Sequence, residues 1–423
     1  MLSGPCGSVM HKNNKMLPTA VLLSFTLPAQ AKGFFEDSQA SLKAQNFYLN
    51  RDFREDPGVS KREEWAQGFV LDFRSGYTPG VVGLGVDAIG MLGIKLDSSP
   101  DRSGTGLLPV GADGRAPDEY SKFGLTAKAR LSKTELKIGT QLLKYPTIAS
   151  STGRILPQTF QGGVLTSKEF DRLTFTYAQI DRTTRRDYSH SEALSLVNKN
   201  RRFSGTPQTD DFRMGGVDYV VNPNLSLSYQ YGELDGIYGQ HYLGVIGSTA
   251  MGPGRLALDA RYFTSNDSGQ ARAGEVDNRT VNVLLTYSQA GHSVGVAYQG
   301  LSGSTAMPYL IGTDAYLTNY MMAADFMEAE ERTWQLRYAY DFVALGIPGL
   351  TFSTRYNRGY HANPATYAGE GREWERDTDL GYTIQSGPLK NVSVLWRNAS
   401  LRSNYQRDID ENRLILTYTL PLF

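Results

Sequence analysis

Cysteine is almost absent from this chain, since Cys6 is the only one in 423 residues. A single cysteine excludes an internal disulfide, so the fold must be stable without covalent cross-links. Histidine is also scarce, with five residues in the whole chain, and no Gly-x-Ser-x-Gly motif or readable Ser/His/Asp spacing is present. We therefore expect no enzyme activity, no metal and no cofactor.

Net charge is absent as well, because 43 basic residues balance 43 acidic ones. This balance gives no reason to expect nucleic acid as a partner. Beyond residue 31 there is no apolar run of ~18 residues, so no helix is predicted to span a membrane. Glycine and tyrosine are abundant instead, at 44 and 25 residues, which suits many strands, tight turns and interfacial rings.

The N-terminus has the pattern of a secretory signal. Lys12 and Lys15 precede an apolar stretch at residues 16–27, and Ala-Gln-Ala at residues 29–31 forms a cleavage site. We expect residues 1–31 to be a signal peptide, with residues 1–9 an over-extended start, and residues 32–423 to form one domain. An exported membrane chain without an apolar helix can only be a closed β-barrel.

The last strand has the alternation that a membrane barrel requires. Two interleaved sets make up residues 413–422: Leu414, Leu416, Tyr418, Leu420 and Leu422 on one face, and Arg413, Ile415, Thr417 and Thr419 on the other. Such a period of two places one face against an apolar medium and the other against a polar one. Phe423 falls out of this phase, and Pro421 interrupts the strand near its end. Similar alternation recurs at residues 82–88, 125–131, 281–287 and 334–342.

Turn spacing distinguishes a barrel from a soluble sandwich. Short turns are predicted at residues 77–80, 132–134, 169–172, 222–224, 252–254, 289–292, 345–349 and 386–390. They are separated by roughly 30 to 55 residues, whereas turns of a sandwich recur about every 8–12. Long polar stretches lie between them, for example at residues 142–166, 181–213, 300–332 and 357–377. With both termini at the short-turn end, eight short turns predict an all-β antiparallel transmembrane barrel of eighteen strands, with nine long loops.

Strand phase indicates which arginines enter the lumen. Arg130, Arg397 and Arg413 are each out of phase with their apolar neighbours. A basic side chain that faced lipid at the midplane would cost ~2–4 kcal/mol, so all three are predicted to face the lumen. A barrel of this size is too wide for side chains to fill, which predicts a channel narrowed by its own loops. The arginines could mark a path for anions or could be scattered charges that hydrate the wall.

From about residue 33 to residue 423 the chain resembles the OprD family of substrate-specific outer-membrane porins. The resemblance rests on GFFEDSQASLKAQNFYLNRDFRE, on EEWAQGFVLDFRSGYTPGVVGLGVDAIGMLGIKLD, on DEYSKFGLTAKARLSKTELKIGTQ, on GRILPQTFQGG and on the final ENRLILTYTLPLF, in this order. It implies a bacterial outer-membrane barrel of eighteen strands, with short periplasmic turns and with long extracellular loops that fold into the pore. It also implies that small carboxylates pass along a ladder of basic residues.

Carried over by motif, the resemblance implies roles for eight residues. The ladder would comprise Arg51 in YLNRDF, Arg62 before EEW, Arg130 in AKARLS, Arg397 in LWRN and Arg413 in NRLIL. The constriction would comprise Arg154 in GRILPQTF on the inward loop, and Tyr309 in PYLIG with Asp325 in AADF on another loop. Tyr309 could equally be a packing ring, and Asp325 could be a solvated loop acid.

KTELKIGTQ and QTFQGG are more similar to the OccK branch, associated with cyclic or aromatic monocarboxylates, than to the OccD branch, associated with basic amino acids. The alternatives are a channel for basic amino acids or peptides, a general diffusion porin and, more remotely, a hydrolase within a barrel. Outer-membrane lipid and lipopolysaccharide are the expected surroundings. The expected assembly is a monomer or a weak trimer.

Overall fold

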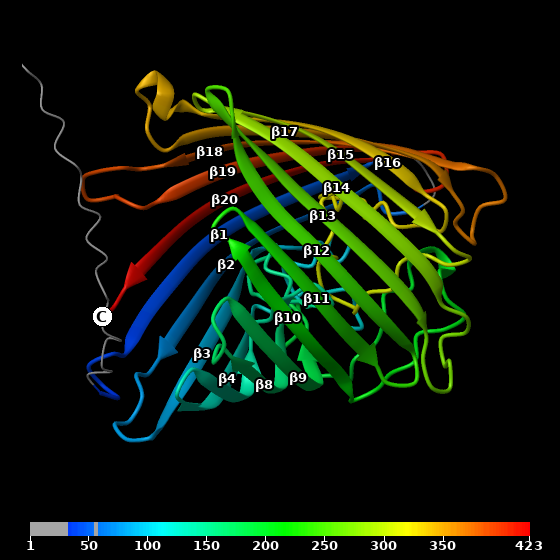
Figure 1. Ribbon diagram of the computed structural model, residues 1–423. Coiled ribbons are helices and arrows are strands. Elements are labelled where there is room, and N and C mark those ends of the chain that lie inside the picture. The colour runs from blue at the N-terminus through cyan, green and yellow to red at the C-terminus, as the bar shows by residue number, and fades with distance from the viewer. Residues whose placement is uncertain (1–32, 55–57) are drawn as a thin grey trace, which may run out of the picture. The chain divides into compact units, whose positions relative to one another are not determined.

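The computed structural model describes residues 33–54 and 58–423, so the predicted signal peptide and Cys6 lie outside the described residues. Eighteen antiparallel strands form one closed sheet, as the sequence predicts (Figure 1). The barrel strands are β1 (Gln39–Phe53), β2 (Lys61–Arg74), β3 (Val82–Asp97), β4 (Glu119–Leu131), β5 (Thr134–Gln141), β8 (Thr159–Ser167), β9 (Leu173–Thr184), β10 (Phe212–Asn222), β11 (Leu225–Leu234), β12 (Tyr238–Met251), β13 (Gly254–Asp267), β14 (Asp277–Gln289), β15 (His292–Ser302), β16 (Arg332–Asp341), β17 (Leu350–Ala362), β18 (Gly371–Thr383), β19 (Ser393–Ser403) and β20 (Ile409–Pro421).

The remaining elements are short. Strands β6 (Lys144–Tyr145) and β7 (Ile148–Ala149) form a small hairpin within the β5–β8 loop. Two 3-10 turns, η1 (Lys199–Arg201) and η2 (Phe342–Leu345), lie in connections. Across residues 33–54 and 58–423, no helix is both long enough and apolar enough to cross a membrane.

The first and last strands pair with each other and close the sheet. Phe47 of β1 lies opposite Ile415 of β20, and both side chains are buried on the lumen side. Leu414 and Leu416 are 49% and 44% exposed on the outer face, so the predicted alternation is confirmed. The out-of-phase Phe423 packs its ring edge-on against Phe73, with ring centroids 6.4 Å apart, beyond the end of β20.

All eight predicted short turns join consecutive barrel strands at one end of the barrel. The opposite end carries four long loops, here named β3–β4 (residues 98–118), β5–β8 (142–158), β9–β10 (185–211) and β15–β16 (303–331). Other connections at this end are short, and the one between β11 and β12 has only residues 235–237. The expectation that every loop at this end is long is therefore wrong.

The predicted long stretch at residues 357–377 is also wrong in its bounds. β17 continues to Ala362 and β18 begins at Gly371, which leaves only residues 363–370 between them. The sequence misleads here because these strand ends are polar on both faces, with Arg358 and Arg376 exposed outside and Glu375 buried inside. Alternation of apolar and polar residues, the usual strand signal, is lost where a barrel rises above the apolar band.

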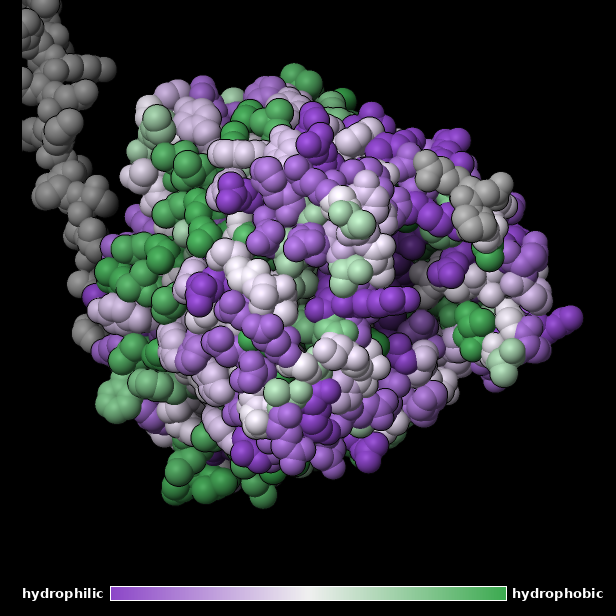
Figure 2. Space-filling view, turned by 90° about the vertical axis from the view of Figure 1, so that its right-hand side faces the viewer, coloured by the Kyte–Doolittle hydropathy of each residue, from purple (hydrophilic) through white to green (hydrophobic). Residues whose placement is uncertain are grey.

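The hydrophobic core of this protein lies inside the barrel, where the long loops pack against lumen-facing side chains. Leu194 and Leu196 of the β9–β10 loop and Leu310 of the β15–β16 loop join wall residues Phe212 and Tyr238 in one buried cluster. The loops therefore fill much of the lumen. Seen from the loop end, the surface is largely hydrophilic and is hollowed to one side (Figure 2).

Buried amides attach the β15–β16 loop to the wall. Asn319 of the loop donates to Thr333 (2.7 Å) and Asn357 (3.2 Å), which lie on β16 and β17. Asn282 of β14 accepts from the backbone N–H of Thr318 at 2.9 Å. Because these groups have little access to water, each would cost about 1–3 kcal/mol if it were left unpaired. Several buried hydrogen bonds of this kind therefore fix the position of the β15–β16 loop.

Candidate functional site

A cavity of about 570 Å³ lies between the loops and the barrel wall. Seven arginines and two aspartates are among its lining residues. The charged residues are Arg51, Arg62, Arg154, Arg186, Arg355, Arg397, Arg413, Asp187 and Asp314. Five of the predicted residues are thus brought together: four from the ladder and Arg154 from the inward loop. Arg186 and Arg355 were not predicted.

Carboxylates on the wall hold several of these arginines in place. Glu411, which is fully buried, accepts from both Arg51 and Arg413 at 2.5 Å. Arg397 forms a two-pronged pair with Asp379 on the adjacent strand, at 2.9 and 3.0 Å. These pairs fix the guanidinium planes and engage only part of their donors, because each guanidinium has five N–H groups.

Arg355 of β17 has the same kind of support. It donates to Asp377 of β18 at 2.6 Å, and these two residues face each other in the strand register. Its phase, opposite to that of Phe352 and Tyr356, is the signal that could have identified it from the sequence. Arg186, by contrast, lies in the long β9–β10 loop, where no periodicity exists to indicate a direction.

Arg154 differs from the wall arginines because its hydrogen bonds go to backbone carbonyls. It donates to Thr105 at 3.0 Å and to Gly153 at 2.9 Å, and it is only 7% exposed. Among the described residues no carboxylate lies within 4 Å of it. Burial, together with the nearby cations Arg413 and Arg186, holds the pKa of Arg154 well below its usual value. An anion that reached this buried cation would relieve both effects.

The opposite side of the cavity is formed by the backbone of the β15–β16 loop. Carbonyls of Tyr320 and Met322 accept from Arg355 (3.4 Å) and Arg413 (3.3 Å). Glu375 of β18 accepts from the N–H groups of Ala323 and Ala324, at 2.8 and 2.7 Å, and so anchors this segment. The cavity therefore has a cationic wall and a wall of carbonyls and apolar side chains.

Arg62 and Arg130 lie towards opposite ends of the barrel. Arg62 donates to the carbonyl of Gly104 at 2.9 Å and lies near the loop end of the barrel. Arg130 points to the lumen, as its phase predicts, but it stacks on Tyr77 at 4.1 Å near the short turns. Arg130 therefore lies in the lumen but outside the arginine cavity, and its role in the ladder stays a prediction.

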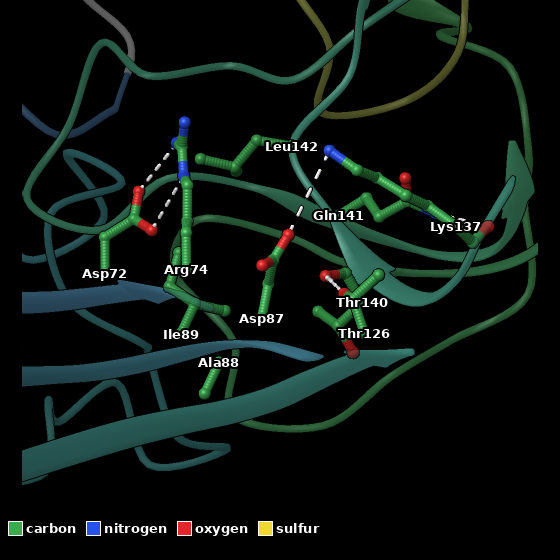
Figure 3. Close-up of a pocket in the computed structure, with 10 residues that line it drawn as sticks. All are labelled: Asp72, Arg74, Asp87, Ala88, Ile89, Thr126, Lys137, Thr140, Gln141 and Leu142. Atoms are coloured by element: carbon green, nitrogen blue, oxygen red, sulfur yellow. Dashed lines mark hydrogen bonds and ion pairs between the residues drawn. The ribbon is translucent and has the colours of Figure 1, made fainter. Parts of the chain in front are cut away.

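A second lumenal cavity, of about 260 Å³, lies on β2 to β5 (Figure 3). Its charges are paired within the wall: Asp72 accepts two hydrogen bonds from Arg74 (3.1 and 2.9 Å), and Asp87 lies 4.0 Å from Lys137. Two cations and two carboxylates line this cavity, whereas seven arginines and two aspartates line the first, so it is a weaker candidate for anion binding.

Tyr309 and Asp325 do not line the arginine cavity. Asp325 accepts two hydrogen bonds from Arg202 (2.6 and 2.8 Å) and a third from the Tyr309 hydroxyl (3.1 Å). Although burial opposes ionisation, Arg202 and Lys199 lower the pKa of Asp325. The expectation that Asp325 faces the eyelet is corrected, because its carboxylate is directed into a buried ion cluster that joins the β9–β10 and β15–β16 loops. That cluster also includes Glu328, 2.8 Å from Arg202.

Comparison with known proteins agrees with this architecture. Residues 32–422 match the family model described as outer membrane porin, OprD family. The chain is 39% identical to the porin-like protein GalP of Pseudomonas putida, over 96% of this chain and 98% of that protein. It is similar to the crystal structure of Pseudomonas aeruginosa OccK9 (OpdG), with a TM-score of 0.90, 47% identity, and coverage of 92% of this chain and 100% of that one. The structure of Pseudomonas aeruginosa OpdK with vanillate has a TM-score of 0.87 and 38% identity over the same shares.

Proposed function

Because this chain belongs to the OprD family of outer membrane porins, we propose that it takes up small carboxylates along the arginines of its lumenal cavity. As a family member it is a substrate-specific channel of the bacterial outer membrane and not an enzyme. The observation that carries the proposal is the convergence of seven arginines on one cavity that has only two aspartates in its lining.

The chemistry of the cavity suits a carboxylate. The guanidinium fork matches the two oxygens of a carboxylate, whereas an ammonium offers only a point charge. Arg51, Arg397 and Arg413 are already held by wall carboxylates, so a solute competes for their remaining donors. This competition keeps each contact weak enough for release, which conduction requires.

The solutes that we propose are cyclic or aromatic monocarboxylates, the class associated with the OccK branch. A ring can lie against Tyr320, Met321 and Met322 while its carboxylate faces the arginines on the wall. Thioether and aromatic groups make favourable contacts of this kind. OpdK, whose crystal structure contains vanillate, an aromatic monocarboxylate, supports this assignment by similarity.

Liposome swelling with a panel of solutes tests the proposal. We expect benzoate and pyroglutamate to enter faster than arginine, and glucose to enter slowest. Benzoate and pyroglutamate are net anions and are attracted to the cationic wall, arginine has a carboxylate but a net positive charge, and glucose has neither charge. Faster swelling with arginine than with any cyclic acid would contradict the OccK-type assignment. Equal rates for glucose and the acids would indicate a general diffusion pore.

A substitution at Arg130 should leave carboxylate selection nearly unchanged. Its guanidinium stacks on Tyr77 outside the cavity, so Arg130→Gln removes no donor from the proposed path. We expect the half-saturating benzoate concentration, measured from single-channel current block, to change by less than about twofold. A rise of about tenfold or more in that concentration would instead show that Arg130 is part of the solute path.

A further inference from the structure

The outer wall carries three exposed arginines at the loop end of neighbouring strands. They are Arg332 on β16, Arg358 on β17 and Arg376 on β18. Arg332 has the phase of Trp334 and Leu336, which are 54% and 57% exposed on the outer face, so it points away from the lumen. None of the three lines the arginine cavity.

Strand register places these arginines in one diagonal row. Arg358 lies directly between Trp334 of β16 and Trp374 of β18. Arg332 is opposite Tyr360, and Arg376 is opposite Tyr356, so each is diagonal to Arg358. Diagonal neighbours on one face of a sheet are about 7–8 Å apart, within reach of long side chains. The three guanidinium groups can therefore converge on one anionic headgroup.

The charges of this row are uncompensated. In the part of the chain that the structure describes, no carboxylate lies within 4 Å of any of the three, whereas Arg213, Arg279 and Arg372 of the outer face are each paired with a carboxylate. Arg279 of β14, for example, lies 3.6 Å from Asp277, and Arg213 of β10 contacts Asp211. A need for solvation alone would not concentrate unpaired cations on three adjacent strands.

The three arginines lie at the loop-end edge of the apolar, lipid-facing band of the outer wall. Towards the short turns the same outer faces become apolar, with Leu336 and Leu380 57% and 43% exposed. A lipid-facing arginine costs ~2–4 kcal/mol at the bilayer midplane but only ~0–1 kcal/mol near the interface. Trp334 and Trp374 flank the row, and aromatic rings of this kind concentrate at the headgroup level. The arginines are thus placed where lipid headgroups begin.

We propose that Arg332, Arg358 and Arg376 form a binding site for the phosphate groups of lipid A, the phosphorylated headgroup of outer-leaflet lipopolysaccharide. Arginine binds phosphate through two parallel N–H donors, and three such forks match a headgroup with two phosphates. The flanking tryptophans contact the boundary between sugar and acyl chains. This lipid site is separate from the solute path, so its existence does not depend on whether the channel carries carboxylates.

The test compares two double variants of the purified, reconstituted porin. Arg358→Gln with Arg376→Gln removes two members of the row, and Arg213→Gln with Arg279→Gln removes two paired arginines of the same outer face. Diphosphorylated lipid A is titrated into each protein in nanodiscs of neutral phospholipid. We expect the apparent Kd of the row variant to rise about tenfold and that of the control to stay within about twofold. Lipid A without phosphates should bind wild type as weakly as diphosphorylated lipid A binds the row variant.

Unchanged binding by the row variant, or an equal loss in the control pair, would overturn the proposal. Binding of wild type to phosphate-free lipid A with full affinity would do the same. Both variants should keep wild-type channel conductance, because none of the four side chains faces the lumen. If the double variant does not fold, the single variants Arg358→Gln and Arg376→Gln should each weaken binding about threefold, and no change in either would also overturn the proposal.

Discussion

Replacing Arg154 by glutamine is expected to raise the half-saturating concentration of a small carboxylate such as benzoate by about tenfold or more. Arg154 is buried in the cavity, donates only to backbone carbonyls and has no carboxylate within 4 Å among the described residues. A charge-assisted hydrogen bond is worth about 1.5–3 kcal/mol, and 1.4 kcal/mol corresponds to a factor of ten. Block of single-channel current by added benzoate measures this concentration directly.

Two controls distinguish a loss of carboxylate binding from a general change in the shape of the pore. Arg154→Lys keeps a cation without the fork, so its half-saturating concentration should lie between those of wild type and Arg154→Gln. Glucose, which has no carboxylate, should enter liposomes carrying either variant at the wild-type rate. If Arg154→Gln binds benzoate like wild type, Arg154 is not part of the solute path, and the arginine cavity does not bind carboxylates in the proposed way.

Replacing Arg202 by glutamine is expected to disrupt the packing of the β9–β10 loop against the β15–β16 loop. The Arg202 side chain is 1% exposed and pairs with both Asp325 and Glu328, so its loss leaves Glu328 without its ion-pair partner and leaves Asp325 with only Lys199, 3.7 Å away. Breaking a buried pair in this way costs about 3–5 kcal/mol. Because the cluster joins the β9–β10 and β15–β16 loops, we expect the loops to separate, the single-channel conductance to rise and the preference for carboxylates over glucose to fall.

The matched control is Arg213→Gln, which breaks the exposed pair with Asp211, where Arg213 is 57% exposed. Exposed pairs contribute only about 0–1 kcal/mol, so conductance and selectivity should stay at wild-type values. Both variants should run as compact, heat-modifiable barrels on electrophoresis, because neither change affects strand pairing. Wild-type conductance in Arg202→Gln would show that the ion cluster does not hold the loops.

The barrel could be predicted from the sequence because its signals are local. A period of two fixes which side chains of a strand face lipid, and short turns mark where two such strands meet. Leu414, Leu416 and Arg413 illustrate this, since their faces follow from neighbours within a few residues. The same rule breaks down at Arg358 and Arg376, where the outer face is polar and the strands were interpreted as a loop.

The loops could not be predicted because long-range contacts determine their positions. Asp325 was expected at the eyelet, yet its carboxylate meets Arg202, which lies 123 residues earlier in the chain. Arg186 enters the cavity from a loop without periodicity, so no pattern marks it. Arg154 was identified only through the resemblance of its motif to a family. Its unpaired, buried state became apparent from the structure.

The pairing of β1 with β20 has a consequence for how the protein is made. β20 is the last of the described barrel strands in chain order and it closes the sheet against β1, so both edges of the sheet stay open until β20 has been synthesised and exported. Open strand edges in lipid leave backbone groups unpaired at a cost of several kcal/mol each. A premature stop that removes only β20 should therefore abolish the whole barrel and expose the chain to periplasmic proteases, rather than yield a slightly shorter porin.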